Sequence, residues 1–134
     1  MPEEWMQLSR EHLRAAELLL KEGLFHLVSF HAQRAAAHAL QAMLDKNCVP
    51  PPHGDTLLEM LSACQACDPA AASLRGACAL LDLYLTDDPD AVIPGMLPWG
   101  PPSYEQAQAT IEAARQVLMT LGRLSSPFAL AAVA

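Results

Sequence analysis

The sequence predicts an all-α protein, folded as an up-and-down antiparallel bundle of about five helices. Three observations lead to this fold class. Apolar residues recur at intervals of three and four positions over long segments, which is the periodicity of helices with one buried face. The prolines fall at the ends of these segments or between them. No stretch shows the alternation of apolar and polar residues that is typical of a β-strand.

The first two helices are expected to form an antiparallel hairpin. The first runs from Pro2 to Glu22, and Gly23 ends it. The second is centred on the stretch Leu24–Leu44 and stops near Asn47, ahead of three prolines that cannot continue a helix. The short turn makes the two helices antiparallel neighbours. Because the second helix is rich in alanine, other helices can approach it closely, and we expect it to be central.

Two shorter helices are predicted next. Asp55 or Thr56 caps a third helix, which fades near Cys67. A fourth helix starts near Pro69 and brings apolar residues as far as Leu85 to the core.

A long irregular loop and a final helix complete the prediction. Residues 86–103 contain several prolines and glycines, an acidic cluster and Trp99, so this loop either binds a partner or folds back on the bundle. Ser103 caps the last helix, with Gln106 as its capping-box partner. We assign residues 1–124 to the bundle and residues 125–134 to an apolar C-terminal tail.

Composition limits the classes of function. The chain has 134 residues, of which 52% are apolar, enough for one domain with a continuous core. Its formal charge is −7 and its eight Lys and Arg are scattered, which argues against duplex binding through a broad basic face. We find no signal segment and no apolar run of about 20 residues, so we expect a cytoplasmic protein without membrane contact.

The four cysteines are interpreted as thiols. Cys64-x-x-Cys67 invites a zinc or redox interpretation, but a structural zinc site needs a second ligand pair at similar spacing. Small buried thiols on a helix face explain the pair more simply. We therefore expect no metal and no cofactor.

A polar stripe on the second helix is the candidate site. His31, Arg34 and His38 are three, four and seven residues apart, which places them on one helix face. A phosphate or carboxylate there would meet Arg34 together with one imidazole, so the stripe predicts an anion or nucleotide site. The alternative is the polar or interface side of an amphipathic helix, with Arg34 paired to an acidic side chain. His31 and His38 lie about 10 Å apart along the helix axis and cannot share a metal ion.

Several segments, in their order along the chain, resemble a known family. The most specific is Phe30–Leu44, which follows Trp5, Leu13 and Gly23 in that order. Three later segments carry the same resemblance. They are His53 with Asp55, Leu57, Leu58 and Leu61, then Leu81 and Tyr84 before Pro89 and Asp90, and finally Tyr104 with Ala107. Together they resemble the HEPN domain (higher eukaryotes and prokaryotes nucleotide-binding), over almost the whole chain.

The resemblance implies an up-and-down helical bundle that forms a homodimer. Many such domains occur beside minimal nucleotidyltransferases, where the pair acts as a toxin–antitoxin or nucleotide-binding system, and some are metal-independent ribonucleases. A nucleotide or RNA ligand is therefore implied. The resemblance also adds Tyr84 and Tyr104 to His31, Arg34 and His38 as candidate anion- or nucleotide-binding residues.

The chain departs from the ribonuclease members of that family. These members are similar to one another in an Arg followed after four to six residues by His, around the loop before the last helix. Here neither Arg nor His occurs between Leu85 and Tyr104, and Asp87 and Asp88 stand where relatives have Arg-Tyr. Carboxylates at that place repel an RNA backbone.

We therefore expect a non-catalytic nucleotide- or substrate-binding subunit, or a partner subunit, associated with a minimal nucleotidyltransferase. No catalytic residue is assigned. One alternative is a HEPN ribonuclease toxin with a non-standard site built from Arg34 and His38, with Tyr84 or Tyr104. Another is a dimeric interaction scaffold without a ligand.

Overall fold

The computed structural model describes residues 2–52, 56–84, 95–97 and 99–125. Within these ranges the chain forms five α-helices and one 3-10 helix; they are α1 (Pro2–Lys21), α2 (Phe25–Lys46), α3 (Leu57–Cys67), η1 (Pro69–Leu74), α4 (Arg75–Asp82) and α5 (Tyr104–Ser125). The predicted all-α class is confirmed. None of the helices in these ranges is both long and apolar enough to cross a membrane.

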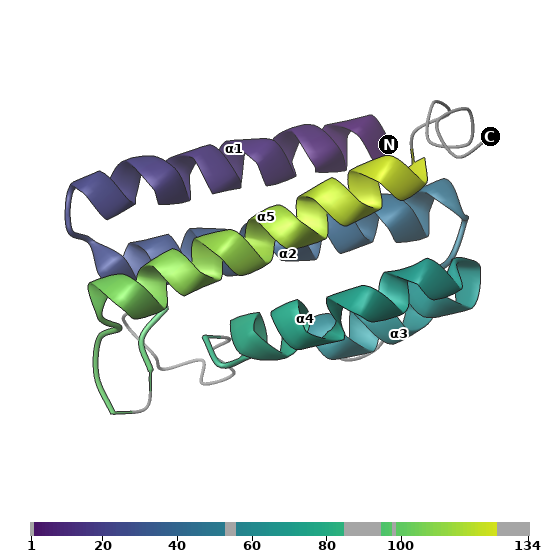
Figure 1. Ribbon diagram of the computed structural model, residues 1–134. Helices are drawn as coiled ribbons and strands as arrows, with labels where there is room; N and C mark the ends of the chain where they lie inside the picture. The colour runs from purple at the N-terminus through teal and green to yellow at the C-terminus, as the bar shows by residue number, and fades with distance from the viewer. Residues whose placement is uncertain (1, 53–55, 85–94, 98, 126–134) are drawn as a thin grey trace.

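Helix α2 is the centre of the bundle. It contacts all four other α-helices, whereas α1 contacts α2 and α5 among the described helices. Figure 1 shows α1 and α2 as an antiparallel hairpin, α5 lying along both of them, and α3 and α4 together on the other side of the bundle. The prediction that the second helix occupies the middle of the fold is thus correct.

Small side chains bring α1 and α2 close together. Ala32, Ala35, Ala36 and Ala39 of α2 are fully buried. The buried hydroxyl of Ser9 on α1 donates a hydrogen bond to the carbonyl oxygen of Ala35, at 2.5 Å. A larger side chain at these alanines would push the helices apart, because protein interiors are close-packed. This close packing also determines how the polar side chains of the two helices meet.

The start of α3 is held by two caps. Thr56 accepts a hydrogen bond from the backbone N–H of Glu59 through its side chain (3.1 Å), as one of the two sequence alternatives predicted. Asp82, at the end of α4, accepts two more, from the N–H groups of Leu57 (2.8 Å) and Leu58 (3.1 Å). The second cap links two helices that are distant in sequence, so no local pattern indicates it.

The fourth predicted helix differs from the expectation in its first part. Residues Pro69–Leu74 form the 3-10 helix η1, and α-helical geometry begins at Arg75. Short 3-10 segments are common at helix starts, where the first N–H groups lack partners. Asp68 accepts one of these N–H groups, that of Ala70, at 3.0 Å. Leu85, which we expected in the core, lies outside the described residues.

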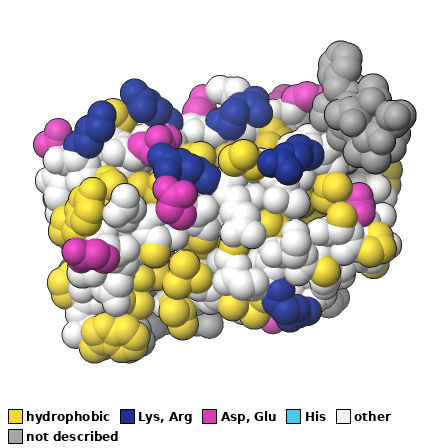
Figure 2. All heavy atoms as spheres, viewed as in Figure 1, with side chains coloured by type: hydrophobic (Ala, Val, Ile, Leu, Met, Phe, Trp, Pro, Cys, Tyr) yellow, Lys and Arg dark blue, Asp and Glu magenta, His cyan; other side chains and the backbone are white. Residues whose placement is uncertain are grey.

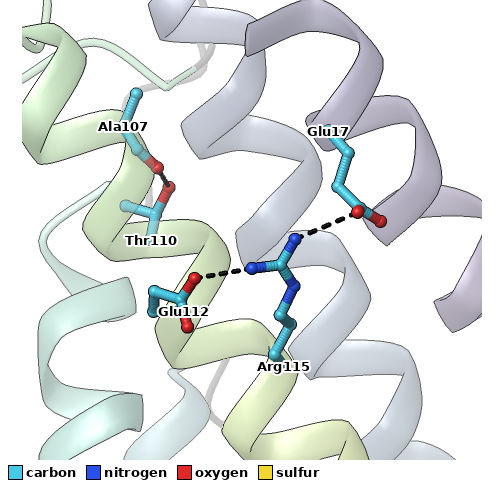
Figure 3. Close-up of polar contacts among 5 residues, drawn as sticks. All are labelled: Glu17, Ala107, Thr110, Glu112 and Arg115. Atoms are coloured by element: carbon cyan, nitrogen blue, oxygen red, sulfur yellow. Dashed lines mark hydrogen bonds and ion pairs between the residues drawn. The ribbon is translucent and has the colours of Figure 1, made fainter.

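Helix α5 begins at the predicted capping box. Ser103 Oγ accepts from the N–H of Gln106 (3.1 Å), and Gln106 Oε1 accepts from the N–H of Ser103 (2.8 Å). Further along, Arg115 bonds to Glu112 of its own helix and to Glu17 of α1 (3.0 Å), as Figure 3 shows. Because these side chains are partly exposed, we expect the pair with Glu17 to contribute less than about 1 kcal/mol.

The described part of the long loop packs against α2 through a glycine. A Cβ atom on Gly95 would lie 1.8 Å from the carbonyl oxygen of His26, and the φ of Gly95 is +77°. Both facts require glycine there. A tight turn follows, closed by two backbone hydrogen bonds of 3.0 Å between Leu97 and Gly100, and Trp99 in this turn is 72% exposed. Trp99 therefore does not fold back on the bundle.

The acidic residues 87, 88 and 90, together with His53 and the tail from residue 126, lie outside the described residues.

Candidate functional site

Four aromatic side chains stack in one row between α1 and α2. Trp5 stacks on His38 (ring centroids 5.2 Å apart, planes at 22°), and His38 stacks on His12 (5.2 Å, 23°). His12 in turn packs against His31 (5.2 Å, 31°). We call these four residues the histidine ladder. No histidine side chain is visible on the face shown in Figure 2, where α5 lies in front.

Equal spacing on two antiparallel helices produces this row. Trp5 and His12 are seven residues apart on α1, and His31 and His38 are seven apart on α2. Seven residues span two helical turns, about 10.5 Å, and keep both rings on one face. When such pairs interdigitate, the inner ring of each helix falls between the two rings of the other helix, at about half that distance from each.

Hydrogen bonds fix both ends of the ladder. The Nδ1 atoms of His12 and His31 lie 2.9 Å apart, so one of the two rings donates its Nδ1 proton to the other. At the opposite end, Trp5 Nε1 donates to a carboxylate oxygen of Asp45 at 2.9 Å, and Gln41 approaches the other oxygen at 3.5 Å.

The histidines of the ladder are held in their neutral form. Burial, the neighbouring Arg34 and then His12 lower the pKa of His38 from 6.5 to about 4, and only 8% of His38 is exposed. Burial also lowers the pKa of His12. The neighbouring His31 and Arg34 lower this pKa further, whereas the carboxylate of Glu11 raises it. Burial alone lowers the pKa of His31. At neutral pH the ladder therefore consists of three uncharged imidazoles and one indole, next to the guanidinium of Arg34.

Arg34 is the cation next to the histidines of the ladder and is half-buried. In the described part of the chain its guanidinium makes no hydrogen bond and no ion pair. The alternative interpretation paired Arg34 with an acidic side chain, but no acidic side chain among the described residues pairs with it. A partly buried cation without a counter-ion favours binding of an anion, since the five N–H donors of arginine match the oxygens of a phosphate or carboxylate.

The structure brings together only part of the predicted site. His31, Arg34 and His38 lie on the α1-facing side of α2, linked by stacking through His12. Tyr84 is buried, with 4% exposed, just after α4, a helix that does not contact α1. Tyr104 packs edge-on against Phe25 at the beginning of α2 (5.8 Å, 77°). The two tyrosines thus stand apart from the ladder.

Sequence reasoning missed two members of this cluster. The structure places His12 and Trp5 of α1 in the ladder, whereas the candidate site taken from the sequence contained neither of them. A signal was present: the seven-residue spacing of Trp5 and His12 equals that of His31 and His38, and the predicted hairpin aligns the two helices antiparallel.

The cysteines lie in a different environment. Burial raises the pKa of Cys64 to about 12, with smaller contributions from Cys67 and Cys78, and burial with the nearby Asp82 raises that of Cys78 to about 12. Cys64 donates its S–H to the carbonyl oxygen of Leu40 at 3.7 Å. Such thiols stay protonated at neutral pH and behave as small apolar groups. Among the described residues, no cluster of three or more His, Cys, Asp or Glu has a geometry that could hold a metal ion.

Residues 2–124 match the profile of the HEPN domain. The chain belongs to the HEPN domain family. No curated protein matches the chain. In this HEPN domain, the histidine ladder joins the first two helices of the bundle.

Three solved structures are similar to this HEPN domain. A HEPN domain protein from Thermotoga maritima superposes with a TM-score of 0.75 at 18% identity, covering 92% of this chain and 98% of its own. A protein from Thermus thermophilus gives 0.73 at 22% identity, with 90% and 95% covered. An archaeal HEPN homologue gives 0.69 at 17% identity, with 91% and 95% covered. At these identities the likeness concerns the fold.

Proposed function

We propose that this HEPN domain is a non-catalytic subunit that binds the phosphate of a nucleotide at Arg34. In this proposal it acts in the cytoplasm as a homodimer and as the partner of a minimal nucleotidyltransferase in a toxin–antitoxin-like system. His31 and His38 flank Arg34 on α2, and His12 and Trp5 complete the site from α1.

The state of Arg34 is the observation that carries the proposal. The guanidinium has no counter-ion within the described residues, and its positive charge lowers the pKa values of His38 and His12. A half-buried charge without a counter-ion is costly next to the buried ring of His38, and a bound anion removes that cost. The rings beside it have N–H groups that can donate hydrogen bonds to phosphate oxygens.

The non-catalytic role is supported by the sequence and by the state of the histidines. The chain has neither Arg nor His between Leu85 and Tyr104, where ribonuclease members of the family carry their motif. A general base that works near neutral pH needs a pKa close to that pH. The pKa of His38 is about 4, so its imidazole is a weak base compared with that requirement.

Ligand binding is tested with a nucleotide panel in thermal-shift and calorimetric titrations. We expect a nucleoside mono- or diphosphate to raise the melting temperature of the wild type at millimolar concentration. Arg34→Ala is expected to abolish the shift, while Arg75→Ala, an exposed arginine on α4, keeps it. If no nucleotide shifts the wild type, or if both variants respond equally, the site proposed at Arg34 is wrong.

Assembly and catalysis are tested separately. Light scattering after size exclusion should give twice the mass of one chain, and a nucleotidyltransferase encoded by a neighbouring gene should co-purify with the protein. Incubation with total RNA should show no cleavage by the wild type. Cleavage that His38→Ala removes would instead establish the ribonuclease alternative with a non-standard site.

A further inference from the structure

We infer that anion binding at Arg34 is coupled to uptake of a proton by the histidine ladder, so that the site holds its ligand more tightly as the pH falls below neutral. This inference rests on the anion site proposed above and concerns how that site is regulated. It follows from the arrangement of the three imidazoles around Arg34.

The His12–His31 pair has room for one additional proton. A single hydrogen bond joins the two Nδ1 atoms at 2.9 Å, and it uses one proton. The donor ring then has a free Nε2 lone pair. Protonation of that atom makes the donor an imidazolium and leaves the hydrogen bond intact, since the charged ring still donates from Nδ1. A second proton would put Nδ1 protons on both rings and break the bond.

The charged groups around the ladder oppose that protonation while the site is empty. On α2, Arg34 repels positive charge on His38 and His12, and His12 and His38 repel each other across 5.2 Å. On α1, Glu11 favours a charged His12, but burial outweighs it. Asp45, at the far end, accepts from Trp5. The lowered pKa values of His12 and His38 agree with this balance, and burial alone lowers the pKa of His31.

A bound anion reverses the balance. Its negative charge offsets that of Arg34 and attracts the imidazolium, so the pKa of the histidine next to it rises in the complex. The complex then holds more protons than the free protein, and by linkage the affinity increases as the pH falls. Uptake of one proton strengthens binding by up to about tenfold per pH unit, between the histidine pKa of the complex and the lower one of the free protein.

Inorganic sulfate is the first probe, because it keeps two negative charges throughout the pH range of interest. Histidine ring resonances are followed by NMR from about pH 8 to about pH 5, with sulfate and with chloride at equal ionic strength. We expect sulfate to raise the pKa of at least one of the ladder histidines by about one unit or more, and chloride to leave it unchanged. The dissociation constant of sulfate should fall over the same range.

Two variants connect the effect to the ladder. His12→Asn keeps a polar atom near the position of Nδ1 but cannot titrate, and it should flatten the pH dependence of sulfate binding. His26→Asn, on the same helix as His31 but outside the ladder, should keep the wild-type pH dependence. The wild-type NMR titration does not depend on either variant folding.

The outcomes separate the two proposals. If sulfate or a nucleotide binds with histidine pKa values unchanged and the same affinity at both ends of the pH range, the proton coupling is wrong and the anion site stands. If His26→Asn flattens the pH dependence as much as His12→Asn, the ladder is not the group that takes up the proton. If sulfate and nucleotides both fail to bind at every pH, the anion site and the coupling are both wrong.

Discussion

Acid should destabilise this protein through His38, which is almost completely buried in a row of rings. The pKa of His38 is about 4 in the folded protein and 6.5 in its ordinary state. Between these two pH values, His38 is therefore neutral in the folded protein and protonated in the unfolded chain. Stability is retained above pH 6.5 and falls as the pH decreases through the window between these two values, because the unfolded state binds more protons there.

The size of this loss follows from the shift. With pKa values of 6.5 and about 4, the free energy of unfolding falls by about 0.8 kcal/mol at pH 6, about 2 at pH 5 and about 3 at pH 4, relative to alkaline pH. These amounts are a sizeable part of the stability of a typical domain, about 5–15 kcal/mol.

The measurement is urea unfolding at several pH values, for the wild type and for His38→Gln. Glutamine does not titrate, so the variant loses the His38 contribution to the pH dependence and keeps those of His12 and His31. The stability difference between the two proteins should therefore change by about 2 kcal/mol between pH 7 and pH 5, with the wild type losing more. A difference that stays constant over this range would show that burial and the neighbouring charges do not hold His38 neutral.

Three further predictions concern the frame around the site. Asp82→Ala removes the carboxylate that caps the start of α3, and urea unfolding should show a loss of about 1–3 kcal/mol; an unchanged midpoint would contradict the two hydrogen bonds. Gly95→Ala brings a Cβ onto the carbonyl oxygen of His26, so hydrogen exchange should become faster at residues 95–97, and unaltered exchange would contradict that contact. Trp99→Ala should change stability by less than about 0.5 kcal/mol, since the side chain is 72% exposed, and a larger loss in a thermal melt would indicate a buried contact.

The helices and their order followed from local rules. Ser103 with Gln106 marked the start of α5, Gly23 marked the turn of the hairpin, and the alanines of α2 indicated a helix that others approach closely. Each of these signals depends on residues within about four positions of one another. The 3-10 start of the fourth helix and the cap that Asp82 supplies to α3 went unpredicted, since the latter joins residues 25 positions apart.

The sequence alone determined the fold class, the central helix and the polar stripe of His31, Arg34 and His38. Only the tertiary structure decided what surrounds that stripe. It added His12 and Trp5 from α1, left Arg34 without a counter-ion among the described residues, and kept Tyr84 and Tyr104 apart. The physical reason is that helical periodicity fixes which residues share a face of one helix, whereas ring stacking, burial and the resulting pKa values depend on how two helices are aligned.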